Sequence, residues 1–83
     1  MSATAAANLA APIAAQAALT PSQSAVLRLA AQGLSNARIA ELLRRTKEGV
    51  ESEMHRIYLR LGLNGSTDHD RRVSAVLWWL TRD

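Results

Sequence analysis

The sequence predicts an all-α protein built from four short helices. Four segments begin with a residue that commonly caps helices and continue with apolar residues at helical spacing, and two of them end at a glycine. Strand-like alternation, internal repeats and a glycine-rich phosphate loop do not occur in the sequence. The chain has 83 residues, enough for one small domain, which we assign to residues 19–83.

The first helix is predicted to begin at Thr20-Pro21-Ser22-Gln23. Thr20 can cap it, proline is tolerated at the first helical position, and Gln23 can complete a capping box. Gly33 is expected to end it, because glycine readily adopts the left-handed conformation of a C-terminal cap. Its apolar stripe is formed by Val26, Leu29 and Ala30, with Leu27 on one flank.

The second helix is expected to have Ser35 as its N-cap. Ala40 is small enough to let another helix approach closely, and Arg44 and Arg45 suit the negative end of the helix dipole. We expect a buried stripe of Ile39, Leu42 and Leu43.

The third helix is expected to run from Thr46, its cap, to Leu61, with Gly62 ending it. Its apolar stripe follows an i, i+4, i+7, i+11 spacing and consists of Val50, Met54, Ile57 and Leu61. The opposite side carries Glu48, Ser52, His55, Arg56 and Leu59, with Glu51 and Tyr58 on a flank. This side should remain free to contact a partner.

A polar segment from Leu63 to Asp70 precedes the fourth helix, which is predicted over about His69 to Thr81 with Thr67 or Asp68 as its cap. The two adjacent tryptophans lie about 100° apart around a helix axis, so both cannot occupy one narrow buried strip. The predicted apolar stripe consists of Val73, Val76, Leu77 and Leu80, next to Trp78 and Trp79.

Composition excludes several classes of protein. The absence of cysteine rules out disulfide scaffolds, cysteine zinc sites and thiol nucleophiles, and is more typical of a cytoplasmic protein. No apolar run reaches the ~18–20 residues of a membrane span. The Ala-rich segment of residues 1–18 lacks the basic start of a secretory signal, so we expect a flexible arm, the alternative being a helix docked on the domain.

The two histidines, His55 and His69, have no metal-ligand spacing with each other. We therefore expect no metal and no cofactor. Because so small a helical bundle offers little room for a water-excluding pocket, we do not expect an enzyme.

The stretch of about residues 19–63, which holds the first three predicted helices, resembles the LuxR/GerE-type helix-turn-helix domain, the DNA-binding output domain of quorum-sensing receptors and NarL-type response regulators. The matching residues are Leu19-Thr20-Pro21, Val26 to Asn36, Ile39 to Leu43, Val50, Ile57 and Arg60 to Leu63. Sigma factor region 4 has a similar helix-turn-helix. The resemblance implies four helices, of which the third enters the major groove and the fourth forms a dimer.

The resemblance also implies roles for individual residues. It places Glu51, Ser52, His55 and Arg56 against DNA bases, and Ser35, Asn36, Thr46, Lys47 and Gly49 against phosphates. The family usually has a basic residue at Glu51, often a histidine at Glu53, and threonine at Gly49. A dimer or partner contact is expected at Val73, Val76, Leu77, Trp78, Trp79, Leu80 and Leu59.

The charge of the chain bears on two hypotheses, a partner that is DNA and a partner that is a protein. The whole chain carries a net charge of +3. Around the third helix five cations, Arg44, Arg45, Lys47, Arg56 and Arg60, face three carboxylates, Glu48, Glu51 and Glu53, so this segment nets +2 and phosphate attraction should be weak. We expect a small stand-alone bacterial transcription regulator that binds duplex DNA as a homodimer. The alternative is a helix-turn-helix that binds a larger transcription factor or RNA polymerase subunit.

Overall fold

The computed structural model of the chain describes residues 19–63 and 67–82. Within them the chain forms four helices and no strand: α3 (Pro21–Ala31), α4 (Asn36–Leu43), α5 (Lys47–Arg60) and α6 (Asp68–Thr81). The all-α prediction is thereby confirmed. The expected arm, residues 1–18, lies outside the described residues, and the domain assignment stays a prediction.

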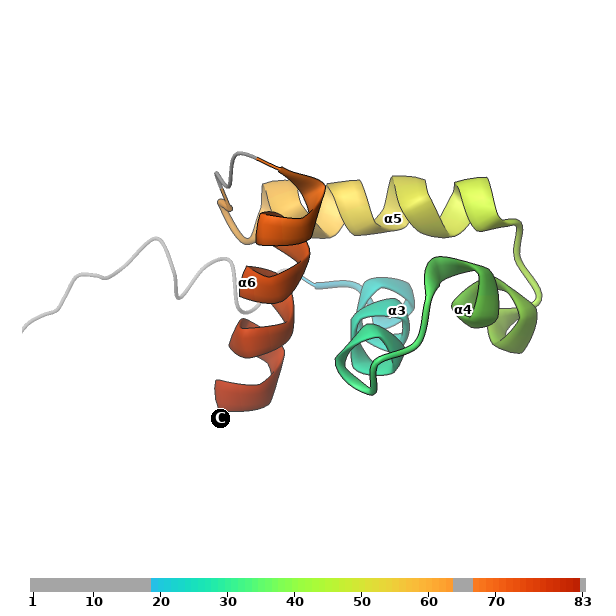
Figure 1. The fold of residues 1–83 in the computed structure, drawn as a ribbon, viewed down its shortest axis with the longest axis horizontal. Helices are drawn as coiled ribbons and strands as arrows, with labels where there is room; N and C mark the ends of the chain where they lie inside the picture. The colour runs from blue at the N-terminus through green and yellow to red at the C-terminus, as the bar shows by residue number, and fades with distance from the viewer. Residues whose placement is uncertain (1–18, 64–66, 83) are drawn as a thin grey trace, which may run out of the picture.

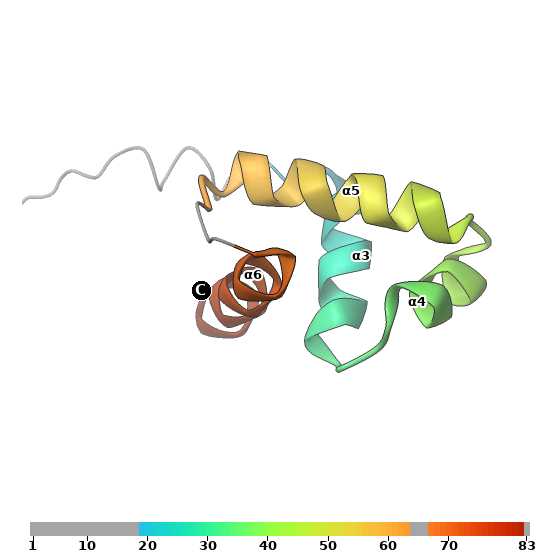
Figure 2. The same cartoon turned by 45° about the horizontal axis from the view of Figure 1, so that its top comes forward.

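The helix α3 lies at the centre of the arrangement, between α6 on one side and α4 on the other (Figure 1 and Figure 2). The helix α5 lies across α3 and α4, and both pack against it. This arrangement leaves the side of α5 away from α3 and α4 uncovered by any of the described helices. None of these helices is long and apolar enough to cross a membrane.

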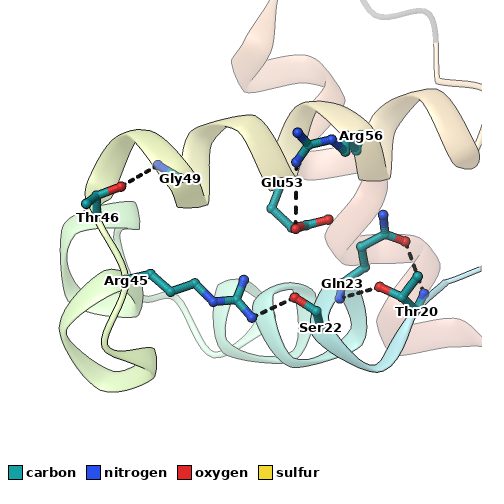
Figure 3. Close-up of polar contacts among 8 residues, drawn as sticks. All are labelled: Thr20, Ser22, Gln23, Arg45, Thr46, Gly49, Glu53 and Arg56. Carbon is teal, nitrogen blue, oxygen red and sulfur yellow. Dashed lines mark hydrogen bonds and ion pairs between the residues drawn. The ribbon is translucent and has the colours of Figure 1, made fainter.

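Each helix begins at the cap that the sequence predicts. Thr20 and Gln23 form the reciprocal capping box: Thr20 Oγ1 accepts from the Gln23 amide at 3.0 Å, and Gln23 Oε1 accepts from the Thr20 amide at 3.1 Å (Figure 3). The other three caps, Ser35, Thr46 and Thr67, each accept from the amide three residues further along the chain. The helix α6 begins at Asp68, one residue earlier than expected.

The helix ends use three residues with positive φ. Two are the predicted glycines, Gly33 (φ 89°) and Gly62 (φ 67°). The third, after α4, is Arg44, with φ 57° and ψ 50°, a conformation that costs a non-glycine residue roughly 1–2 kcal/mol. The neighbouring Arg45 supports this turn, because its Nη2 donates to Ser22 Oγ at 2.6 Å and ties the turn to α3 (Figure 3).

The hydrophobic core forms where α3, α4 and α5 meet. Its five fully buried large side chains are Val26, Leu27, Ile39, Val50 and Ile57. Truncating one of them to alanine should destabilise the fold by about 2–5 kcal/mol for the larger side chains. The predicted stripe of α5 is confirmed, since Met54 is buried as well and Leu61 packs against the core at its margin.

The predicted stripe of α4 was wrong at one position. Leu42 is 48% exposed, and the inward side of the helix is formed by Ile39 and Ala40, with Leu43 half-buried against the core. Leu42 and Leu43 follow Ile39 by three and four residues and so lie on opposite sides of it around the axis, and the side that packs against the core is that of Leu43 and Ala40.

The predicted stripe of α6 was also wrong in orientation. Its fully buried residue is Ala75, and the half-buried Val76, Trp78 and Trp79 pack against the core. Indole rings remove more apolar area from water than aliphatic side chains do, so the helix is rotated to pack both tryptophans against the core. As a consequence, Val73, Leu77 and Leu80 point outward.

Candidate nucleic-acid interface

The outward face of α5, which we define as Glu48, Ser52, His55, Arg56 and Leu59, is exposed in full. This confirms the expectation that the stripe through Val50 and Ile57 points inward. Leu59 is 68% exposed, more than any other large hydrophobic residue described. Glu51 is exposed on the flank of this face that turns towards the start of α4.

The four residues predicted to face bases are brought together. They line one shallow hollow of about 460 Å³ on the outward face, together with Glu48. The hollow is open, carries both signs of charge, and contains a hydroxyl and an imidazole. Such a surface can exchange hydrogen bonds with the edges of base pairs but encloses no small molecule.

Three of the five residues predicted to face phosphates also come together. Ser35, Asn36 and Lys47 line a second hollow of about 530 Å³, where the turn after α3 meets the start of α5. The remaining two are joined to each other, since the Gly49 amide donates to Thr46 Oγ1 at 2.9 Å (Figure 3). A Cβ on Gly49 would lie 3.0 Å from that oxygen, so glycine allows this cap to close tightly.

The cations of α5 have partners on their own helix. Lys47 Nζ lies 3.9 Å from Glu51 Oε2, and Arg56 Nη1 lies 3.8 Å from Glu53 Oε1 (Figure 3). The side chain of Glu53 is only 16% exposed, whereas that of Arg56 is 62% exposed. Solvent-exposed ion pairs such as that of Lys47 and Glu51 are worth at most about 1 kcal/mol, so an incoming phosphate can take over Lys47.

Sequence reasoning missed one residue of this surface, Arg72 of α6. Its Nη1 donates to Asn36 Oδ1 at 2.7 Å and its Nη2 donates to the Leu34 carbonyl at 2.8 Å. It also lines a third hollow, of about 350 Å³, with Glu51, His55 and others. Its spacing could have indicated this position. Arg72 precedes Ala75 by three residues and Trp79 by seven, which places it on the inward side of α6.

Tyr58 was expected on a flank and is buried beside this third hollow. Burial raises the pKa of its hydroxyl above 10.0, because the phenolate would lose hydration, and the positive charge of Arg72 partly opposes this shift of the pKa. The tyrosine is therefore neutral at physiological pH.

The outward stripe of α6, which we define as Val73, Leu77 and Leu80, forms a second uncovered surface. These residues are 44%, 55% and 63% exposed and follow one another at spacings of four and three, so they form a row along the helix. Trp78 and Trp79, which we expected in the same contact, are half-buried and pack against the core, and their part in such a contact stays a prediction. The stripe is apolar throughout and can bury its surface only against another apolar one.

Histidine and carboxylate groups are present at the third hollow, where His55, His69, Glu51 and Asp68 all contribute to the lining. Over the described part of the chain, however, no three His, Cys, Asp or Glu side chains are placed so that they could hold a metal ion.

A helix that ends at a glycine turn, a short second helix, and a third helix with an uncovered polar face define a helix-turn-helix protein. The sequence profile described as bacterial regulatory proteins, luxR family, matches residues 17–73, which is more than half of the chain. The chain belongs to the luxR family, whose helix-turn-helix domain is a DNA-binding domain of transcription regulators and not an enzymatic one. No curated protein and no solved structure matches the chain.

Proposed function

We propose that the protein binds duplex DNA by placing the outward face of α5 in the major groove, and that it does so as a homodimer held by α6. One observation carries the proposal: the exposed outward face of α5 is continuous with the start of α4. Asn36 lines a hollow with Lys47 on one side and a hollow with Glu51 and His55 on the other. A helix-turn-helix docks through these two elements.

The residues on the outward face suit the hydrogen-bonding groups of base pairs. Arg56 can donate to the two acceptors of guanine, and Glu51 can accept from the amino group of cytosine. Ser52 is a donor and an acceptor and therefore tolerates several bases. A glutamate in this position disfavours bases that present acceptors, so Glu51 contributes to specificity by exclusion as well as by attraction.

The start of α4 suits phosphate. Ser35 and Asn36 lie at the N-terminus of the helix, where unpaired amides and the helix dipole favour an anion, and Lys47 faces the same hollow. Thr46 and Gly49 cap α5 with each other, and the Gly49 amide is already bonded to Thr46. We therefore expect Ser35, Asn36 and Lys47 to contribute more to phosphate binding than Thr46 and Gly49.

The outward stripe of α6 supports a dimer. Two copies can pair their stripes about a two-fold axis, which would present two α5 helices to half-sites about 34–36 Å apart. A standard protein interface buries roughly 800 Å² per partner, and three aliphatic side chains fall well short of this area. The dimer should therefore be weak in free solution and should form on paired half-sites.

The test is a fluorescence anisotropy titration with random and genomic duplexes at low salt. Wild-type protein should bind at micromolar concentration or tighter, and Lys47→Glu and Arg56→Glu should each weaken binding at least about tenfold. Arg28→Glu is the matched control, because Arg28 is exposed on α3 and lines none of the three hollows. Absence of binding to any duplex, or equal losses in all three variants, would contradict the proposal.

A second candidate function is favoured by the acidic groups of α5. Glu51 and Glu53 neutralise the two cations nearest the outward face, which suits a helix-turn-helix that binds a transcription factor or RNA polymerase subunit instead of DNA. Co-purification with purified RNA polymerase, or with a LuxR-type regulator, separates the two candidates. If the protein binds the polymerase or the regulator but no duplex, the protein-binding function is favoured. If it retains neither of these two proteins, that function is contradicted.

A further inference from the structure

Arg72 joins three parts of the molecule. It belongs to α6, is half-buried, and donates both to Asn36 Oδ1 at the start of α4 and to the carbonyl of Leu34 in the turn after α3. It also lies beside Tyr58 of α5, since both line the third hollow. Its bond to Asn36 joins residues 36 positions apart in the sequence.

The chemistry of the two groups fixes which way the Asn36 amide points. A guanidinium has donors only, whereas an asparagine amide has an acceptor on one side and two donors on the other. The atom of Asn36 that faces Arg72 must therefore be Oδ1. The Nδ2 hydrogens are directed away from Arg72, and a phosphate oxygen, which only accepts, is the complementary partner for them.

We infer that Arg72 is a positioning residue for DNA binding: it holds the Asn36 amide with its donors turned to the phosphate site and fixes the turn at Leu34. This inference rests on the proposed function, because it assigns Asn36 a phosphate contact. We assign Arg72 no contact with DNA of its own: one hydrogen on each outer nitrogen is used within the protein, and its effect on binding passes through Asn36. Loss of Arg72 frees the amide to rotate, and half of its orientations present an acceptor to the phosphate.

The inference also links the two uncovered surfaces. Arg72 immediately precedes Val73, the first residue of the outward stripe of α6. A contact at that stripe would therefore involve the turn of α6 that contains Arg72, the residue that orients Asn36.

A double-mutant cycle tests the inference on a duplex that the wild-type protein binds. We expect Arg72→Gln to weaken binding about fivefold to tenfold, Asn36→Ala to weaken it similarly, and the double variant to be no weaker than Asn36→Ala alone. Neither single variant should lower the slope of log K against log salt by a full phosphate equivalent, because the Asn36 amide is uncharged and Arg72 acts through it. Arg71→Gln is the matched control, because it removes a guanidinium from the neighbouring position of α6, where Arg71 pairs with Asp68 at 2.5 Å and lies over the ring of Tyr58.

A merely structural role would lower thermal stability and DNA affinity together and would leave the two substitutions additive. Additive losses in the cycle would overturn the inference, and so would a salt slope lowered by a full phosphate equivalent in Arg72→Gln, because Arg72 would then contact a phosphate itself. Should Arg72→Gln fail to fold, Arg72→Lys replaces it, because one ammonium group cannot reproduce the forked contacts to Asn36 and Leu34. The thermal midpoint of each variant establishes that it is folded.

A readout without DNA separates this inference from the proposed function. In ¹⁵N spectra of the free protein, the side-chain amide of Asn36 should shift and exchange faster with water in Arg72→Gln than in the wild type or in Arg71→Gln. Unchanged Asn36 signals would overturn the inference even if duplex DNA binds. If the wild type binds no duplex, the proposed function fails and Arg72 no longer positions a phosphate contact, whatever the amide signals show.

Discussion

The two 14-residue helices α5 and α6 both leave one face uncovered, and the chemistry of these faces differs. The outward face of α5 carries a hydroxyl, an imidazole and charged groups around a single exposed leucine. The outward stripe of α6 consists of three aliphatic side chains. A charged surface that stays wet suits a hydrated polyanion, whereas an aliphatic row gains most when another apolar surface excludes water from it.

The difference follows from how each helix uses its apolar residues. On α5 the apolar stripe faces the core, and only Leu59 is left over among the large hydrophobic residues. On α6 the inward side is completed by Ala75 and the tryptophans, which leaves a second apolar side without a partner in the chain. A helix at the edge of a single bundle can bury only one apolar side against that bundle, so the second apolar side of α6 stays exposed to water. We therefore expect α5 to bind nucleic acid and α6 to bind a second copy.

The largest expected effect separates the two faces through Leu77. Leu77→Asp places a charge in the middle of the outward stripe of α6, where desolvating it disfavours a dimer by at least about a hundredfold. On a duplex selected from a random pool, the wild type should bind with two copies and the variant with one. Ser74→Asp, on the same exposed turn of α6 but outside the stripe, is the control. Two copies of Leu77→Asp on the duplex would show that the outward stripe of α6 does not form the dimer contact.

The next effect is the response to salt. If α5 neutralises about two to four phosphates, DNA affinity should fall about 10- to 100-fold between 50 and 200 mM salt, whereas contact between apolar stripes should not weaken. Anisotropy on a single half-site measures the first quantity and sedimentation equilibrium measures the second. Equal salt sensitivity of both would mean that the faces do not differ in the way proposed.

A smaller effect comes from releasing a cation on α5. Glu53→Gln removes the partner of Arg56, so DNA affinity should rise about threefold to tenfold and the salt slope should steepen by up to one phosphate. Dimerisation should be unchanged. The matched control is Glu41→Gln, which removes the same kind of ion pair, with Arg38, from α4. A gain of equal size in Glu41→Gln would show that the effect is one of net charge alone.

The smallest effect is expected at Leu59. Because Leu59 is one isolated apolar residue on a polar face, Leu59→Ser should change the free energy of unfolding by no more than about 0.5 kcal/mol and should leave dimerisation unchanged. Chemical denaturation and sedimentation measure these quantities. A loss of dimer in Leu59→Ser would move the protein contact from α6 to α5.

Local signals in the sequence predicted the helices and the face of α5 well. A cap residue and its partner amide lie three positions apart, so Thr20, Ser35 and Thr46 could be identified without knowledge of the tertiary structure, and the choice for the last helix was narrowed to Thr67 or Asp68. The stripe through Val50 and Ile57 is long and regular, and its reverse side was therefore predictable. The glycines Gly33 and Gly62 were predictable because only glycine takes positive φ without strain.

Other features depend on how helices meet and were not predictable from spacing. Leu42 and Leu43 are equally apolar, and only the position of α5 decides which one is buried. The rotation of α6 was missed because aliphatic spacing alone ignores the larger area of two indole rings. Arg44 gives no signal of its positive φ, and the bond from Arg72 to Asn36 joins residues 36 positions apart. Such long-range polar contacts require the fold to be known.

The most direct test of the central claim is a titration of ¹⁵N-labelled protein with a bound duplex, followed by backbone amide shifts. We expect the largest shifts on Ser52, His55 and Arg56 and at the start of α4. Residues of the outward stripe of α6 should shift only when the duplex holds two half-sites. Shifts concentrated on Val73, Leu77 and Leu80 on a single half-site, with none on the outward face of α5, would contradict it.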